Sequence, residues 1–157
     1  MSKATPGTRM LETAGVPFSV HGYDYDSTAD RIGLQAAEAL GEPPNRVLKT
    51  LMALVDGQPA CAILASDGEV AMKKLAAALG GKSAQMMKPA DAERISGYKV
   101  GGISPFGQKR RIRTVIDAGA LVQPYVFINA GQRGLQVRLD PHDARRLLDA
   151  VVAPIAA

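Results

Sequence analysis

The sequence of 157 residues is poor in the side chains that most often mark a catalytic or metal site. Its single cysteine, Cys61, excludes an internal disulfide and a cysteine-rich metal cage. Its two histidines, His21 and His142, stand far apart, and neither a His-Glu-x-x-His nor a Cys-x-x-Cys spacing occurs. A Walker A loop and a Gly-x-Ser-x-Gly elbow are missing as well. If the protein is an enzyme, we expect it to work without a standard triad, a metal or another cofactor.

Long apolar runs are also missing. No run approaches the roughly 20 residues that span a bilayer, so we predict no transmembrane helix. The first residues contain no apolar signal core, which makes secretion by that route improbable and predicts a cytoplasmic protein without a membrane partner. Apolar residues make up 46% and charged residues 22% of the sequence, a globular balance. Without an internal repeat or a long linker, residues 1–157 are predicted to form one domain.

The apolar spacing predicts helices and strands in irregular alternation. Asp56-Gly57 separates two apolar runs and is a strong signal for a β-hairpin, which makes that pair antiparallel. We therefore predict an α/β domain with a mixed sheet. Helices are expected over 5–14, 30–40, 72–79 and 89–95 and from 140 to about Val151, and strands over 18–23, 47–55, 59–65, 114–117, 125–129 and 135–139.

Charge is unevenly placed along the chain. Residues 1–45 carry three basic and six acidic side chains, a net charge of −3, whereas residues 46–157 carry a net charge of +7. Between Glu93 and Asp117 there is no acid at all. Such a stretch favours a polyanion such as RNA, although a solvated cationic face explains it equally simply. The basic residues of this window are Arg94, Lys99, Lys109, Arg110, Arg111 and Arg113.

Three features point to a binding pocket. Lys49 lies inside an otherwise apolar predicted strand, where a buried ammonium needs a ligand or a charge partner unless it reaches water at the strand end. Gly101-Gly102 begins a turn whose amides can converge on an anionic oxygen, although a turn without a ligand has the same composition. A second glycine turn, 129–134, carries Arg133. Together they suit a nucleotide 3′ end or an acyl ester.

Four segments in this order resemble the YbaK/EbsC family, the free-standing relatives of the editing domain of bacterial prolyl-tRNA synthetases. The matches span roughly residues 8–150. The matching residues are Val47-x-Lys49-Thr50-Leu51, Lys73-Lys74-Leu75-Ala76-x-Ala78-Leu79-Gly80, Gly97-Tyr98-x-Val100-Gly101-Gly102-Ile103-Ser104-Pro105-x-Gly107-Gln108-Lys109 and Gly131-x-Arg133-Gly134-Leu135.

The resemblance implies a curved, barrel-like mixed sheet surrounded by helices. It also implies hydrolytic removal of a wrong amino acid from tRNA, with cysteine on tRNA(Pro) as the substrate in the branch nearest to this sequence. The family lysine corresponds to Lys49, the substrate-loop glycine to Gly101 and the late turn to 129–134. Aminoacylated tRNA(Pro) is the expected partner. The resemblance also allows other tRNAs and a transient complex with prolyl-tRNA synthetase.

Two departures bear on the substrate. The cysteine-clearing branch often has serine where this chain has Asn129, and aspartate where it has Gln136. Compared with serine, Asn129 is also polar but its side chain reaches further. Compared with aspartate, Gln136 lacks the negative charge. A related branch clears alanine, serine, threonine or small non-protein amino acids such as 2-aminobutyrate. Two other readings stay open: a module that binds an RNA 3′ end without catalysis, and a small-molecule hydrolase.

An aminoacyl ester is already activated, so positioning and electrostatics can supply most of its cleavage. We expect the amides near Gly101 and Gly102 to face the ester carbonyl, and Lys49 to hold the terminal phosphate or the developing charge. Water or the thiol of the substrate would attack. A steric sieve would select the amino acid. The predicted sieve walls are Tyr23, Ile32 and Ala53; the other substrate contacts are Ile103, Ser104, Asn129, Gly131 and Gly134; the tRNA contacts are Lys109, Arg110, Arg111, Arg113 and Arg133.

Overall fold

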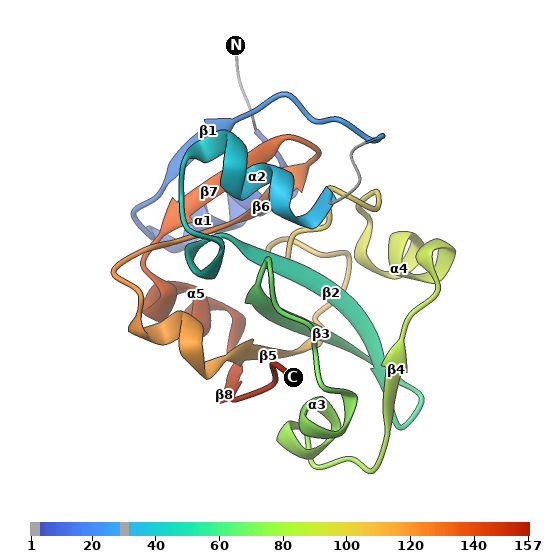
Figure 1. Ribbon diagram of the computed structural model, residues 1–157. Coiled ribbons are helices and arrows are strands. Elements are labelled where there is room, and N and C mark those ends of the chain that lie inside the picture. The colour runs from blue at the N-terminus through green and yellow to red at the C-terminus, as the bar shows by residue number, and fades with distance from the viewer. Residues whose placement is uncertain (1–3, 29–31) are drawn as a thin grey trace.

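The computed structural model describes residues 4–28 and 32–157, with only the backbone described at 32 and 33. Helices and strands alternate irregularly along the chain (Figure 1). The helices are α1 (Pro6–Ala14), α2 (Ile32–Leu40), α3 (Met72–Ala78), α4 (Pro89–Ser96) and α5 (Pro141–Leu148), with 3-10 turns η1 (Pro44–Arg46) and η2 (Ala118–Val122). The strands are β1 (Ser19–Gly22), β2 (Leu48–Val55), β3 (Gln58–Ala65), β4 (Ala84–Met86), β5 (Arg113–Asp117), β6 (Val126–Gln132), β7 (Leu135–Leu139) and β8 (Val151–Ala153).

The strands form two sheets. One has the order β4-β2-β3-β5-β8 and the other the order β1-β7-β6. The larger sheet is mixed, because β3 pairs with β2 antiparallel and with β5 parallel. A parallel bridge between Val47 and Phe127 joins the two sheets. The mixed α/β fold predicted from the sequence is therefore confirmed.

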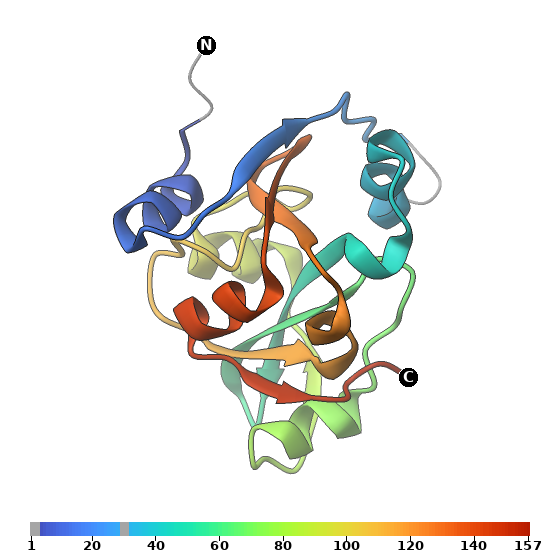
Figure 2. The same ribbon diagram turned by 90° about the vertical axis from the view of Figure 1, so that its left-hand side faces the viewer.

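The main core lies between the sheets. Leu48 and Met52 of β2 face inward together with Cys61 and Ile63 of β3, and the apolar side chains of β6 and β7 meet them. A second cluster forms on the opposite face of the larger sheet, where Leu75 of α3 packs. A third, small cluster joins α2 to Val47 and Phe127. In the view of Figure 2, α1 and α2 lie at opposite sides of the smaller sheet.

Local signals explain most element boundaries. The hairpin turn is made by Asp56 and Gly57, whose φ angles are 50° and 78°, as a tight two-residue turn requires. The hydroxyl of Thr5 accepts a hydrogen bond from the Thr8 N–H, and Gly15 ends α1 with a φ of 72°. The last helix ends at Leu148, so the prediction that Val151 lies on it is wrong. The strands β4 and β8, of three residues each, were not expected from the sequence.

One edge of β2 is paired along only part of its length. β4 pairs with Ala53–Val55, and the Met87 N–H donates to the Met52 carbonyl at 3.1 Å. Toward the start of β2, residues 48–51 have no strand on this edge within the described chain. Because alternate residues of a strand direct their backbone groups to the same edge, the N–H and C=O of Thr50 share the direction of the Met52 carbonyl. This open edge positions the candidate site.

Candidate functional site

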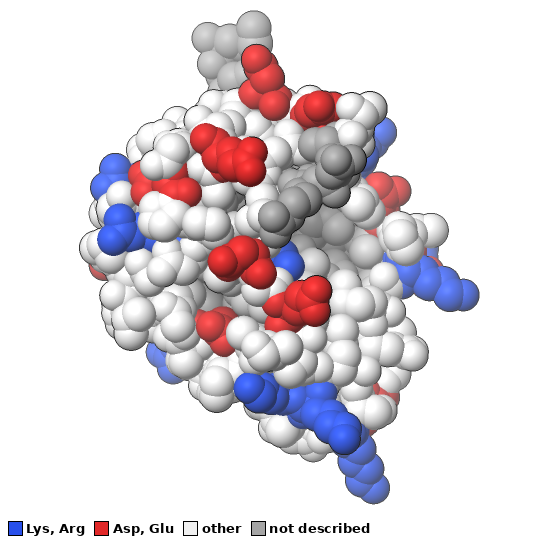
Figure 3. All heavy atoms as spheres, viewed as in Figure 1, with Lys and Arg blue, Asp and Glu red and all other residues white. Residues whose placement is uncertain are grey.

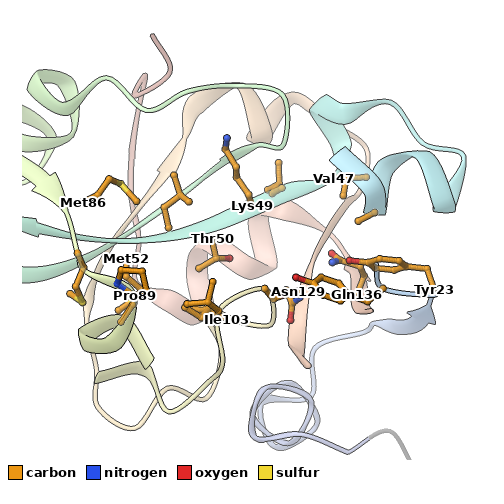
Figure 4. Close-up of a pocket in the computed structure, with 18 residues that line it drawn as sticks. Tyr23, Val47, Lys49, Thr50, Met52, Met86, Pro89, Ile103, Asn129 and Gln136 are labelled. Atoms are coloured by element: carbon orange, nitrogen blue, oxygen red, sulfur yellow. Dashed lines mark hydrogen bonds between the residues drawn. The ribbon is translucent and has the colours of Figure 1, made fainter. Parts of the chain in front are cut away.

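A pocket of about 290 Å³ lies at the open edge of β2 (Figure 4). Segments that are distant in the sequence meet there: β2, the chain after β1, the start of α4, the glycine turn at 100–103 and the paired strands β6 and β7. No histidine, cysteine, serine or carboxylate is among its described lining residues. These are Tyr23, Tyr25, Ala36, Val47, Leu48, Lys49, Thr50, Leu51, Met52, Met86, Met87, Pro89, Ala92, Val100, Gly101, Ile103, Asn129 and Gln136.

The alternation of β2 divides the pocket into two sides. The half-buried Lys49 extends from one face of the strand, and Thr50 extends from the other face (Figure 4). Thr50 lies on the side of Met52 and Ile103, which is largely apolar. Lys49 makes no ion pair within the described residues. One side of the pocket thus offers a cation. The other side offers an apolar surface near Met52 and Ile103, with the polar side chains of Asn129 and Gln136 further along the same side.

Asn129 connects the two glycine turns. It is 9% exposed, and its Oδ1 accepts hydrogen bonds from the N–H groups of Gly131 at 2.6 Å and Gln132 at 3.2 Å. Its Nδ2 donates to the Gly101 carbonyl at 3.3 Å. Asn129 is also the cross-strand partner of Gln136. This set of three hydrogen bonds, which we call the Asn129 clasp, fixes the Gly101 turn against β6.

The Gly101 turn is also held from outside. Arg133 donates from Nε to the Val100 carbonyl at 2.9 Å, and its guanidinium lies 5.5 Å from the centre of the Tyr25 ring. Gly101 has a φ of 90°, and a Cβ there would lie 2.5 Å from the Tyr25 hydroxyl. Only glycine fits this position. The Gly101 N–H makes no hydrogen bond within the described chain, whereas the Gly102 N–H donates to the Lys99 carbonyl at 2.8 Å.

Two oxygens of the pocket lining are buried without a hydrogen-bond partner among the described residues: Thr50 Oγ1 and Gln136 Oε1. Gln136 is only 4% exposed. Beside it, burial raises the pKa of the Tyr23 phenol, and a hydrogen bond that the Tyr23 oxygen accepts from the side-chain amide N–H of Gln136 opposes part of that rise. Buried polar atoms are almost always paired in folded proteins, so these oxygens mark places where a ligand would complete the hydrogen bonding.

Comparison with known proteins identifies the family. A family model described as the aminoacyl-tRNA editing domain matches residues 29–147. The chain belongs to the aminoacyl-tRNA editing domain family. It is 32% identical over 153 residues to EbsC of Enterococcus faecalis, a protein named as a candidate Cys-tRNA(Pro)/Cys-tRNA(Cys) deacylase, with 96% of this chain and 92% of EbsC covered. The resemblance to YbaK/EbsC is thereby confirmed.

Two further matches agree. The proline–tRNA ligase of Geobacter metallireducens is 34% identical over 73 residues, which is 46% of this chain and 13% of the ligase. A crystal structure titled as a candidate trans-editing enzyme for prolyl-tRNA synthetase superposes with a TM-score of 0.84 at 21% identity and covers 99% of both chains. The structural match shows that the two chains share a fold over 99% of their lengths.

The editing-domain pocket brings together five of the predicted site residues. Lys49, Gly101, Tyr23, Ile103 and Asn129 all line it. The sequence thus pointed to two of its walls, the lysine strand and the glycine turn. The predicted Ile32 belongs to α2, but its side chain lies outside the described residues.

Other predicted site residues do not line the pocket. Ala53 is 1% exposed in the cluster beneath α3, because it faces away from the inner core. Gly102 is buried behind the turn. Ser104 is fully buried, and its Oγ accepts a hydrogen bond from the Phe106 N–H at 3.1 Å. Each of these positions shapes the fold around the pocket.

Two glycines, Gly131 and Gly134, do not line the pocket but allow neighbouring segments to pack closely around it. A Cβ on Gly131, whose φ is 106°, would lie 2.6 Å from the ring of Tyr98. The Gly134 carbonyl accepts a hydrogen bond from the Tyr23 N–H at 2.8 Å, and a Cβ there would lie 2.5 Å from the Tyr23 carbonyl oxygen. Gly134 therefore lets the chain after β1 approach closely enough to present Tyr23 to the pocket.

The basic segment 109–113 lies elsewhere on the editing domain. Arg110 and Arg111 line a groove with Met10 and Leu147, and this groove shares no lining residue with the pocket at β2. Arg111 lies 3.6 Å from Asp149 in an exposed pair. In the view of Figure 3, acidic side chains occupy the upper and central surface, and basic ones gather over the end that carries α3. Of the predicted tRNA contacts, only Arg133 adjoins the Gly101 turn.

Sequence reasoning missed part of the lining. The start of α4 contributes Pro89 and Ala92, and Met52, Met86 and Met87 surround them. Their apolar character looks like ordinary core in the sequence. Thr50 gave a detectable signal, because it is a polar residue next to Lys49 within an apolar strand.

Proposed function

We propose that this protein removes a mischarged small amino acid, cysteine foremost, from tRNA(Pro) by cleavage of the aminoacyl ester. The observation that carries the proposal is that Lys49 and the Gly101 turn line one pocket whose described lining includes no histidine, cysteine, serine or carboxylate. The names of EbsC and of the proline–tRNA ligases support the choice of amino acid and tRNA. Residues 1–157 act as one editing domain in this proposal.

The reaction needs few catalytic groups, because the ester is already activated. In the proposal, the free N–H of Gly101 faces the ester carbonyl oxygen and stabilises the charge that develops there. A water molecule attacks the carbonyl carbon, the bond to the 3′ oxygen of the ribose breaks, and that oxygen takes up a proton. For cysteine, the thiol of the substrate is the alternative attacking group. The Gly102 N–H is already bonded to Lys99, so the oxyanion contact falls to Gly101.

Lys49 has a different part in this proposal. Its amine extends from the face of β2 opposite Thr50, so it holds the terminal phosphate of the tRNA while the amino acid lies across the strand (Figure 4). Arg133, next to the Gly101 turn, is placed to contact the adjoining nucleotide. The basic segment 109–113 would contact tRNA further from the ester, and a transient complex with prolyl-tRNA synthetase would bring the substrate.

A single-turnover assay tests the function. tRNA(Pro) charged separately with cysteine, serine, alanine and 2-aminobutyrate is mixed with excess protein, and ester loss is followed. With protein below saturation, Lys49→Ala should lower the discharge of each substrate by about 10–100-fold, the loss that corresponds to one charge-assisted contact with a phosphate. Lys73→Ala, an exposed lysine of α3, is the matched control and should keep the wild-type rate.

The outcomes separate the readings. A wild-type rate in Lys49→Ala would refute the proposed role of Lys49. Wild-type protein that binds charged tRNA(Pro) and protects every ester would instead be a non-catalytic RNA-end binder.

A further inference from the structure

We propose that Thr50 is a specificity residue, which favours amino acids whose β-carbon carries a hydrogen-bond donor, a hydroxyl or a thiol, over isosteric amino acids that carry a methyl group. This inference rests on the proposed function and deepens it, because it assigns the chemical class of the side chain that the pocket selects.

The first observation is the state of the Thr50 hydroxyl. Its Oγ1 is buried and has no hydrogen-bond partner among the described residues. A threonine hydroxyl can both donate and accept, so leaving it unpaired in the interior costs free energy. The strand does not require a polar side chain at this point, because valine has the same shape and a similar preference for strands. A ligand that forms a hydrogen bond with Oγ1 would remove this free-energy cost and would explain why a threonine stands at this position.

The second observation is where Thr50 points. In Figure 4 it lies on the same side of β2 as the apolar residues Met52, Ile103 and Pro89, and Asn129 and Gln136 lie further along that side. Ala92 of α4 is 5% exposed and also lines the pocket. The terminal nucleotide with its phosphate does not suit this apolar surface. The part of the substrate that does is the small amino-acid side chain, and Thr50 Oγ1 is a polar atom placed to meet it.

The other unpaired oxygen of the pocket, Oε1 of Gln136, would contact a different part of the substrate. Gln136 is the cross-strand partner of Asn129, which contacts the Gly101 carbonyl. Gln136 therefore lies beside the turn that would hold the ester. Every aminoacyl ester has the groups around that carbonyl in common, so Gln136 acts on all substrates alike. Thr50 is the position that distinguishes among them.

A site that pairs with a substrate hydroxyl discriminates against the analogue that lacks it, because the protein group is then left buried and unpaired. Serine, cysteine and 2-aminobutyrate differ at one atom only: a hydroxyl, a thiol or a methyl group on the β-carbon. A thiol is a weaker donor than a hydroxyl. We therefore expect the part of the preference over 2-aminobutyrate that Thr50 supplies, and that Thr50→Val removes, to be larger for serine than for cysteine.

The experiment measures single-turnover discharge of tRNA(Pro) charged with serine, cysteine or 2-aminobutyrate. Wild-type protein should discharge seryl-tRNA(Pro) about 3–10-fold faster than the 2-aminobutyryl ester, the value of one neutral hydrogen bond. Thr50→Val should abolish that ratio by slowing serine and accelerating 2-aminobutyrate. Thr50→Ser should retain the ratio. Thr50→Ala, which also lacks the hydroxyl, should lose it and keeps the test independent of how well valine packs.

Gln136→Met is the matched control, because it removes the other unpaired oxygen of the same pocket. It should slow all three substrates and leave their ratios unchanged. The inference is overturned if wild-type protein discharges serine and 2-aminobutyrate equally, if Thr50→Val keeps the ratio, or if Gln136→Met abolishes it. If wild-type protein discharges none of the esters, the proposed function fails, which is a different result from discharge without discrimination.

Discussion

The Asn129 clasp allows a prediction that separates stability from activity. Asn129→Ala removes hydrogen bonds of 2.6, 3.2 and 3.3 Å to Gly131, Gln132 and Gly101 from a nearly buried site. At about 0.5–1.5 kcal/mol for each bond, with the longest at the low end, the loss is about 2–4 kcal/mol. For a chain of this length, this corresponds to a fall in Tm of roughly 5–15 °C.

Asn129→Asp changes only one part of the clasp. Its carboxylate still accepts from the N–H groups of Gly131 and Gln132, and these bonds become stronger with a charged acceptor. It cannot donate to the Gly101 carbonyl, and it places two oxygens against each other there. We therefore expect a free energy of unfolding within about 1 kcal/mol of wild type. Discharge should fall about 10–100-fold, because small displacements at a reacting centre are costly.

Thermal unfolding and single-turnover discharge of cysteinyl-tRNA(Pro) on the same preparations test both variants. The decisive case is Asn129→Asp, which should remain stable but lose activity. Wild-type discharge by this variant would show that the position of the Gly101 carbonyl does not matter for the reaction. A loss of Tm as large as that of Asn129→Ala would show that the clasp energies are assigned to the wrong bonds.

Two further predictions concern other parts of the molecule. Burial raises the pKa of the Cys61 thiol from 9.0 to about 12, so between these values the unfolded chain loses a proton that the folded chain keeps. Above pH 9 the free energy of unfolding, measured by urea titration, should therefore fall with pH more steeply in wild type than in Cys61→Ala. The difference in slope should reach about 1.4 kcal/mol per pH unit, and equal slopes would contradict the prediction. Reversing Lys109 and Arg110 to glutamate should weaken tRNA binding and reduce the slope of log affinity against log salt by about 2, whereas reversing the exposed Lys73 and Lys82 should not. An unchanged slope would remove segment 109–113 from the tRNA interface.

Much of the fold was predictable because its signals are local. Asp56-Gly57 requires the hairpin turn that the structure has, and the apolar periods give β2, β3 and the helices α1 and α3 within a few residues. The three-residue strands β4 and β8 were missed because so short a segment has no period to detect. Their pairing depends on neighbouring strands, and β4 forms only where it meets Ala53–Val55.

The candidate site was likewise predictable from the sequence only where its signals are local. Lys49 and Gly101 stand out in the sequence because a cation in an apolar strand and a double glycine are locally unusual. Ala53 was expected in the pocket and lies in the cluster beneath α3 instead, since alternation puts it on the face of β2 that α3 covers. Ala92 and Met87 were not expected, because nothing local distinguishes a pocket wall from ordinary core.

The amino-acid order by itself determined the types of the longer elements, the hairpin and the motifs that place this chain among editing domains, because each depends on residues close together in the chain. Only the tertiary structure decided that β4 stops short of Thr50, which leaves the edge of β2 open. It also decided that Lys49 and Thr50 present a cation and a hydroxyl to opposite sides of one cavity. The physical reason is that a pocket is the space left between segments distant in sequence, and no local pattern records which segments meet.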